Sequence, residues 1–100
     1  MRLTSKQVSI IRSTARSVFG NSVQVLLFGS RTNDEKRGGD IDLLVQSAEN
    51  KVLNISNKIT FIVELKKQLG DQKIDVILSG IDENRSPIIQ IARKTGIAIC

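Results

Sequence analysis

Three aspartates have the neighbours and the spacing that chemistry with oxygen ligands requires. Asp40 and Asp42 stand two positions apart in a largely apolar run at 40–45, and Asp75 lies in a similar run at 73–78. Successive side chains of a strand point to opposite faces, so Asp40 and Asp42 share a face if their run is a strand. Asp75 then faces away from its apolar neighbours. We therefore expect three carboxylates on one face of a sheet.

Carboxylates this close together repel one another unless a cation compensates their charge. Ligands that offer only oxygen suit Mg²⁺ or Mn²⁺, and two such ions could activate an attacking hydroxyl and neutralise a leaving pyrophosphate. The chain has no histidine and a single cysteine, Cys100, which excludes zinc sites and catalysis by a Ser-His or Cys-His arrangement. Gly29-Ser30 offers backbone N–H groups and a hydroxyl to phosphate oxygens. These features predict nucleotidyl transfer.

The spacing of apolar residues, together with the capping, glycine and proline residues between the apolar segments, predicts an α-β-β-α-β-α order. Thr4 and Gln7 form a capping-box pattern before a helical apolar repeat that Gly20 ends. Ser86-Pro87 is a typical helix start. We expect helices at about 4–19, 55–69 and 86–96, strands at 23–28, 40–45 and 73–78, a loop at 46–52, and a short terminal strand at 97–100.

The connections between these elements predict where the candidate site residues come together. A loop joins the first two strands, most simply antiparallel, and a helix joins the second and third, which favours a parallel pair. Gly29, Ser30 and the three aspartates then meet at one sheet edge. The expected fold class is α/β (α+β), a small mixed β-sheet with helices packed on one face. Three apolar side chains are expected on or near its open face: Leu26, Leu44 and Ile77. They would contact a protein partner or the base of the nucleotide, or would simply pack within the domain.

Length and composition predict one globular domain over residues 1–100. Of the 100 residues, 40% are apolar and 25% charged, and no apolar run approaches the ~18 residues that span a bilayer. Without a secretory leader, the expected location is cytoplasmic. The net charge of +5 is compatible with a nucleic-acid partner, but only 3% of residues are aromatic, which disfavours direct binding of single strands. The sequence is compatible with either a monomer or a homo-oligomer.

The residues Gly29-Ser30, Asp40-Ile41-Asp42 and Lys73-Ile74-Asp75-Val76-Ile77 together resemble the signature of the DNA polymerase beta superfamily of nucleotidyltransferases. The short length is similar to its minimal nucleotidyltransferase (MNT) branch. The resemblance implies the nucleotidyltransferase fold. It also implies that Asp40 and Asp42 bind the divalent ions, Mg²⁺ or Mn²⁺, two of them when nucleotide is bound.

The same resemblance assigns the remaining roles. Asp75 completes the metal site and helps to activate the acceptor hydroxyl. The nucleotide-binding residues would be Gly29, Ser30 and Arg31. The loop at 32–39 is more charged than is usual in the family, which leaves the base preference open.

The implied reaction transfers a nucleoside monophosphate, AMP from ATP or the equivalent from another NTP, to a macromolecular acceptor with release of pyrophosphate. Minimal nucleotidyltransferases often pair with a small helical HEPN protein as the antitoxin of a toxin–antitoxin system, so the resemblance implies a HEPN partner as acceptor. The alternative is a binding module that neutralises its partner by occlusion without needing catalysis.

Overall fold

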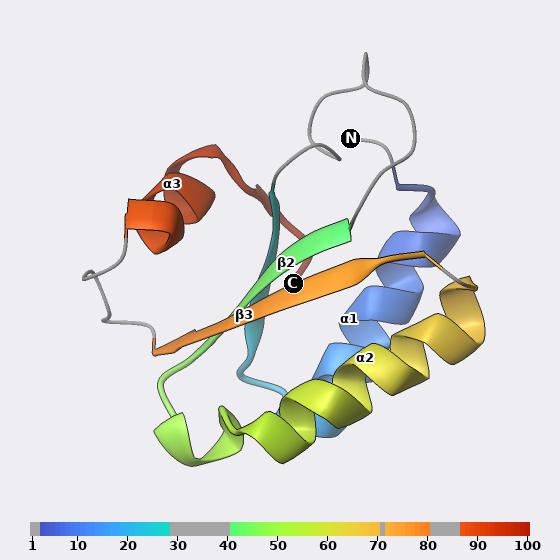
Figure 1. The fold of residues 1–100 in the computed structure, drawn as a ribbon, viewed down its shortest axis with the longest axis horizontal. Coiled ribbons are helices and arrows are strands. Elements are labelled where there is room, and N and C mark those ends of the chain that lie inside the picture. Colours follow the sequence, from blue (N-terminus) through green and yellow to red (C-terminus); the bar gives the residue numbers. More distant parts are fainter. Residues whose placement is uncertain (1–2, 29–40, 71, 81–86) are drawn as a thin grey trace.

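A computed structural model describes residues 3–28, 41–70, 72–80 and 87–100. Within them the chain forms a four-stranded mixed sheet and three α-helices, in the order that the sequence predicts (Figure 1). The predicted α/β (α+β) class with a small mixed sheet is thereby confirmed. None of the described helices has the length and apolar character needed to cross a membrane.

The first helix, α1 (Ser5–Phe19), begins and ends where its sequence signals lie. The Thr4 hydroxyl accepts from the Gln7 backbone N–H at 3.1 Å, and the Gln7 side chain accepts from the Thr4 N–H at 2.9 Å, which completes the capping box. Gly20 follows with φ 99° and ψ 165°, a conformation that is essentially restricted to glycine. Both boundaries therefore follow from local chemistry.

The second and third helices are α2 (Ile55–Leu69) and α3 (Pro87–Thr95). The Asn54 side chain caps α2 by accepting from a backbone N–H of its first turn, and Gly70 ends it with φ 90° and ψ −165°. A short 3-10 helix, η2 (Asn50–Val52), precedes α2.

The strands are β1 (Gln24–Phe28), β2 (Ile41–Ser47), β3 (Ile74–Gly80) and β4 (Ile97–Ala98), in the sheet order β3-β2-β1-β4. β1 runs antiparallel to β2 and β4, and β2 runs parallel to β3, as the connections predict. The prediction was wrong at the far ends of β2 and β3. Both strands run two residues further than expected because 46–47 and 79–80 pair with each other.

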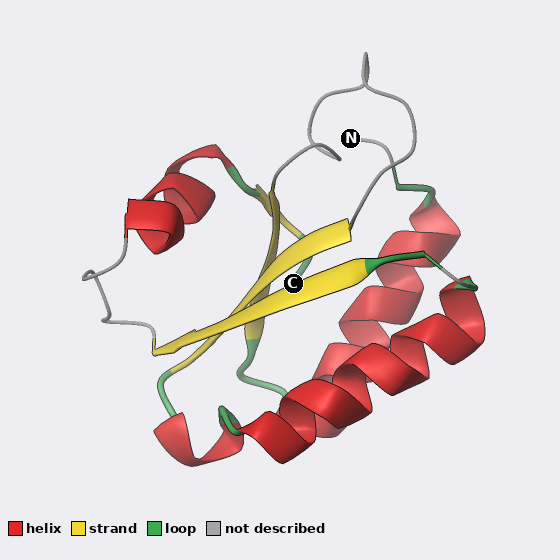
Figure 2. Ribbon diagram, in the orientation of Figure 1, coloured by secondary structure: helices red, strands yellow, loops and turns green. Residues whose placement is uncertain are grey.

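One face of the sheet packs against α1 and α2, which lie side by side (Figure 2). Phe19 of α1 and Phe61 of α2 meet edge to face, with ring centroids 5.3 Å apart and planes at 73°. Beneath them lie the inward residues of the three long strands, among them Leu27, Leu43 and Val76. Burial of these apolar surfaces holds the two long helices to the sheet.

The third helix lies on the other face, where the sequence predicted an open surface. Ile89 of α3 packs with Leu44, and Leu26, Phe28 and Ile77 pack around them. Two of the three helices therefore follow the predicted one-sided packing and α3 does not. The reason is that β2 is apolar on both faces: Leu43 and Leu44 are both fully buried. Leu26, Leu44 and Ile77 are packing residues of this second core.

Candidate active site

The register of β2 and β3 brings two predicted site residues together. Asp42 and Asp75 are direct partners in the parallel pair, so they stand on neighbouring strands about 4.8 Å apart. Both alternate with residues that pack against α1 and α2, and both therefore point to the opposite face. Two of the three expected carboxylates therefore lie side by side on one face.

The buried residues beside the two aspartates fix this register. Ile41 pairs with Ile74, and both lie in the core under α1 and α2. The Ile41 N–H donates to the carbonyl oxygen of Lys73 at 2.9 Å, which aligns the starts of the two strands. A slip by one residue would move a carboxylate into the core and an isoleucine out of it, so the hydrophobic pattern enforces the pairing.

β1 completes the row on the other side of Asp42. Phe28, its last residue, is the register partner of Asp42, so the row across the sheet is Phe28–Asp42–Asp75. Gly29 directly follows Phe28 in the chain. Four predicted site residues lie outside the described residues: Gly29, Ser30, Arg31 and Asp40. Their placement relative to the row stays a prediction.

The donor set of the row fits a hard divalent cation. Asp42 is half-buried and Asp75 is exposed, so the pair combines a carboxylate partly shielded from water with one open to it. Carboxylate oxygens are the ligands that Mg²⁺ prefers. Within the described ranges no group of three or more histidine, cysteine or acidic side chains is close enough to hold a metal ion. The third carboxylate that the sequence predicts, Asp40, lies outside these ranges.

A second feature of this face, which the sequence analysis missed, is the attachment of α3 by Arg93. The Arg93 Nε donates to Gln46 Oε1 at 2.7 Å, and its Nη2 donates to the Gly80 carbonyl oxygen at 2.9 Å and to Ser79 Oγ at 3.4 Å. Gln46 and Ser79 are buried register partners. Arg93 thus anchors α3 over the far ends of β2 and β3.

The anchoring role of Arg93 could not have been predicted from the spacing of residues in the sequence. Its partners come from the two strands extended beyond their predicted ends, and the face chosen by α3 is a tertiary property. The result is a face with three rows: carboxylates at the starts of β2 and β3, apolar side chains under Ile89 in the middle, and the anchored polar row at the far end. The position of α3 therefore leaves the carboxylate row at the opposite end from its anchor.

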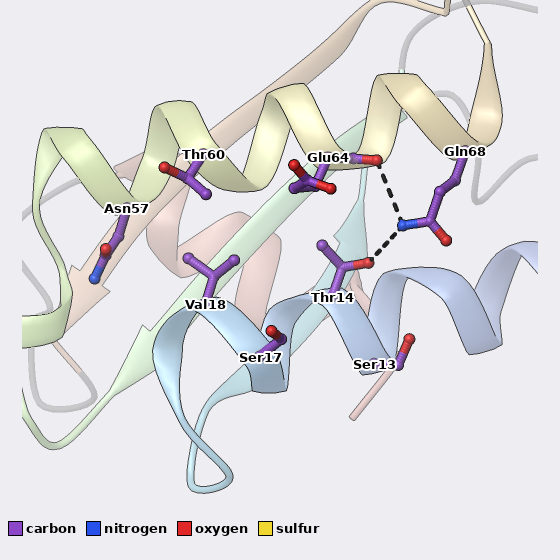
Figure 3. Close-up of a pocket in the computed structure, with 8 residues that line it drawn as sticks. All are labelled: Ser13, Thr14, Ser17, Val18, Asn57, Thr60, Glu64 and Gln68. Carbon is purple, nitrogen blue, oxygen red and sulfur yellow. Dashed lines mark hydrogen bonds between the residues drawn. The ribbon is translucent and has the colours of Figure 1, made fainter.

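A cavity of about 580 Å³ lies elsewhere, between α1 and α2 (Figure 3). Gln68 Nε2 donates to Thr14 Oγ1 at 3.4 Å across it. Its lining residues come only from these two helices: Ser13, Thr14, Ser17, Val18, Asn57, Thr60, Glu64 and Gln68. Because Asp42 and Asp75 face away from the helical pair, this cavity is separate from the carboxylate row.

The described part of the chain is thus a mixed sheet with two helices on one face and, on the other face, two aspartates side by side at the start of two parallel strands. Residues 11–100 match the family model described as polymerase beta, nucleotidyltransferase, so the chain belongs to this family. No curated protein sequence matches the chain. Membership of the family supports a nucleotidyltransferase activity.

Proposed function

We propose that the protein transfers AMP from ATP to a hydroxyl of a macromolecular acceptor, with Mg²⁺ or Mn²⁺ and with release of pyrophosphate. The observation that carries this proposal is the direct register pairing of Asp42 with Asp75 on one sheet face. Two carboxylates held at strand distance offer adjacent oxygen ligands for Mg²⁺, which proteins commonly bind through one or two carboxylates together with substrate phosphates. The family match supports the same reaction class.

Each site residue has a distinct role in the proposal. Asp42 and Asp75, together with Asp40, hold the divalent ions, which when bound neutralise charge on the triphosphate. Gly29, Ser30 and Arg31 contact the phosphates through backbone N–H groups, a hydroxyl and a guanidinium group. Phe28, which directly precedes this segment in the sequence, is the register partner of Asp42.

The transfer itself needs one bond made and one broken. The acceptor oxygen bonds to the α-phosphorus, the bond from that phosphorus to the bridging oxygen breaks, and pyrophosphate leaves. Asp75 accepts the proton of the acceptor hydroxyl, directly or through a water molecule. Asp75 suits this role because its side chain is exposed, whereas Asp42 is half-buried.

The acceptor that we propose is a helical protein partner of the HEPN type, as the resemblance to minimal nucleotidyltransferases implies. An exposed carboxylate at a sheet edge is accessible to a macromolecule. In this proposal the protein is an antitoxin that modifies its partner. The second candidate is neutralisation by occlusion, in which binding alone blocks the partner.

Label transfer tests the reaction. The purified protein is incubated with ATP labelled at the α-phosphate, Mg²⁺ or Mn²⁺, and lysate of its source cell. We expect a labelled macromolecule with the wild type and a loss of label of at least about 100-fold with Asp42→Asn or Asp75→Asn, as is common when a group acting in the transition state is removed. Glu49→Gln, which changes an exposed acid outside the row, should label normally.

The outcomes separate the two candidates. Label that persists in Asp42→Asn, or its absence with each nucleotide and each metal ion, would contradict the transferase. Where a partner is identified, Asp42→Asn should abolish both its labelling and its neutralisation if modification is the mechanism. Neutralisation that survives without label would favour occlusion.

A further inference from the structure

An exposed apolar stripe runs along α2 on the side that does not face α1. Ile55, Ile59 and Val63 are 68%, 56% and 45% exposed. They are spaced four residues apart, so they lie in one line about 12 Å long on the helix surface. By contrast, the α2 residues that line the cavity toward α1 are polar. Aligned exposed isoleucine and valine side chains of this kind are typical of a contact surface rather than of solvated helix.

Lysines border this stripe. Lys66 lies one turn beyond Ile62 and Val63, and Lys58 lies one turn beyond Ile55. Lys67 follows, and its ammonium group pairs with Glu64 at 3.2 Å. Glu64 is the single acid of α2, against three lysines. The surface is therefore an apolar line with a positive border.

The charge pattern disfavours a second copy of this chain as the occupant. An antiparallel or a parallel pair of α2 helices would bring together two surfaces that each carry three lysines and one glutamate. A parallel arrangement would bring each lysine next to its own equivalent. Both arrangements bring two surfaces of net positive charge together around a small apolar contact, and this repulsion costs free energy.

We propose that α2 docks an amphipathic helix of another protein whose apolar line is bordered by aspartate or glutamate. The apolar line would pack on Ile55, Ile59 and Val63, and the acids would pair with Lys58 and Lys66. The stripe belongs to the helical layer, on the other side of the sheet from Asp42 and Asp75. Docking is therefore separable from the chemistry, and this inference does not rest on the proposed function.

The test uses a fluorescent helical peptide of about five turns, about 18 residues long, with leucines in one line and glutamates beside it. A matched peptide carries lysines in place of the glutamates. Fluorescence anisotropy with the full chain measures both. We expect the glutamate peptide to bind at least about tenfold more tightly than the lysine peptide. The largest NMR amide shifts should fall on α2.

Ile59→Ser is the decisive variant, because Ile59 is exposed and its replacement leaves the core intact. We expect binding of the glutamate peptide to weaken at least about tenfold. The matched control is Ile91→Ser on α3, since Ile91 is 58% exposed and Ile59 is 56% exposed. This control should bind as the wild type does. Lys58→Glu with Lys66→Glu should reverse the preference to the lysine peptide.

Three results would overturn the proposal. The first is unchanged binding by Ile59→Ser, which would show that charge alone attracts the peptide. The second is a set of amide shifts centred away from α2. The third is a concentration-dependent dimer in sedimentation that Ile59→Ser dissociates, which would make a second copy the occupant. None of these measurements involves nucleotide, so their failure is distinct from failure of the transfer reaction.

Discussion

Asp42 and Asp75 lie side by side because their strands are in register, and their charges repel at that distance. The buried neighbours Ile41 and Ile74 supply the free energy that keeps the two carboxylates in place. A cation that binds between the carboxylates would bind the folded chain and not the unfolded chain. Metal binding should therefore be visible as a change in stability, independently of any reaction.

Asp75→Asn tests this linkage. Mg²⁺ in large excess over its dissociation constant should raise the melting temperature of the wild type by several degrees, since a hundredfold excess corresponds to about 2.7 kcal/mol. The variant should lose most of this increase. With a chelator present it should be at least as stable as the wild type, because one of the repelling charges is gone. Thermal unfolding followed by circular dichroism measures both.

Glu49→Gln serves as the control for the loss of one negative charge, since Glu49 is exposed and lies outside the row. It should keep the full Mg²⁺ effect. If Asp75→Asn responded to Mg²⁺ as the wild type does, the two carboxylates would not form the metal site.

Among the three helices, α3 packs against the smaller of the two described apolar clusters. Its described attachments include Ile89 in a small apolar cluster and the Arg93 hydrogen bonds to the strand ends. The long helices, by contrast, share a core with three strands. Elements with few buried contacts open locally at lower free energy than the rest of a protein. We therefore expect α3 to open before α1 and α2.

Arg93→Met tests the contribution of the anchor. Methionine keeps much of the length of the side chain but leaves the buried groups Gln46 and Ser79 without this donor, at a cost of about 1–3 kcal/mol. Native-state hydrogen exchange should show faster exchange at the α3 amides and little change in α1. Lys94→Met, at the exposed neighbouring position, should leave exchange unchanged. Uniform acceleration across all helices would contradict a local role.

Helix ends were predictable from sequence and strand ends were not. Thr4, Asn54, Gly20 and Gly70 act within one turn of the chain, so the sequence around each boundary contains the cause. The ends of β2 and β3 depend on partner strands, because Gln46 pairs with Gln24 on one side and with Ser79 on the other. The sequence at 46–47 is polar and resembles a loop.

In the candidate site too, some features follow from the local sequence and others depend on tertiary packing. Alternation and the helical crossover predicted that Asp42 and Asp75 share a face and an edge, and the register confirms it. The side of the sheet taken by α3 was mispredicted because Leu43 and Leu44 make both faces of β2 apolar. No local pattern states which face a third helix will cover.

The molecule as a whole has two cores of unequal size, one on each face of the sheet. The larger contains the edge-to-face pair of Phe19 and Phe61, and the smaller centres on Leu44 and Ile89. Domains of this size are stable by only about 5–15 kcal/mol. Loss of one large side chain from the main core therefore removes a substantial share of the total.

Phe61→Ala should lower the free energy of unfolding by about 3–5 kcal/mol, because the fully buried ring leaves a cavity between α1 and α2. Urea denaturation measures the change, and the slow-exchanging amides of both long helices should lose protection together. Val63→Ala on the same helix should change stability by less than about 0.5 kcal/mol, since Val63 is exposed. Equal effects of the two variants would contradict the described packing of α2.

The crossover from β2 through α2 to β3 has an implication for recognising similar chains. Asp42 and Asp75 meet because two strands start at the same level, whatever length of chain joins them. Extra residues in the connection before Asn54, or an added turn in α2, would change the interval between the acids while leaving their meeting point intact. A search pattern with a fixed interval would miss such chains. A pattern that ties each acid to the first or second residue of an apolar strand would find them.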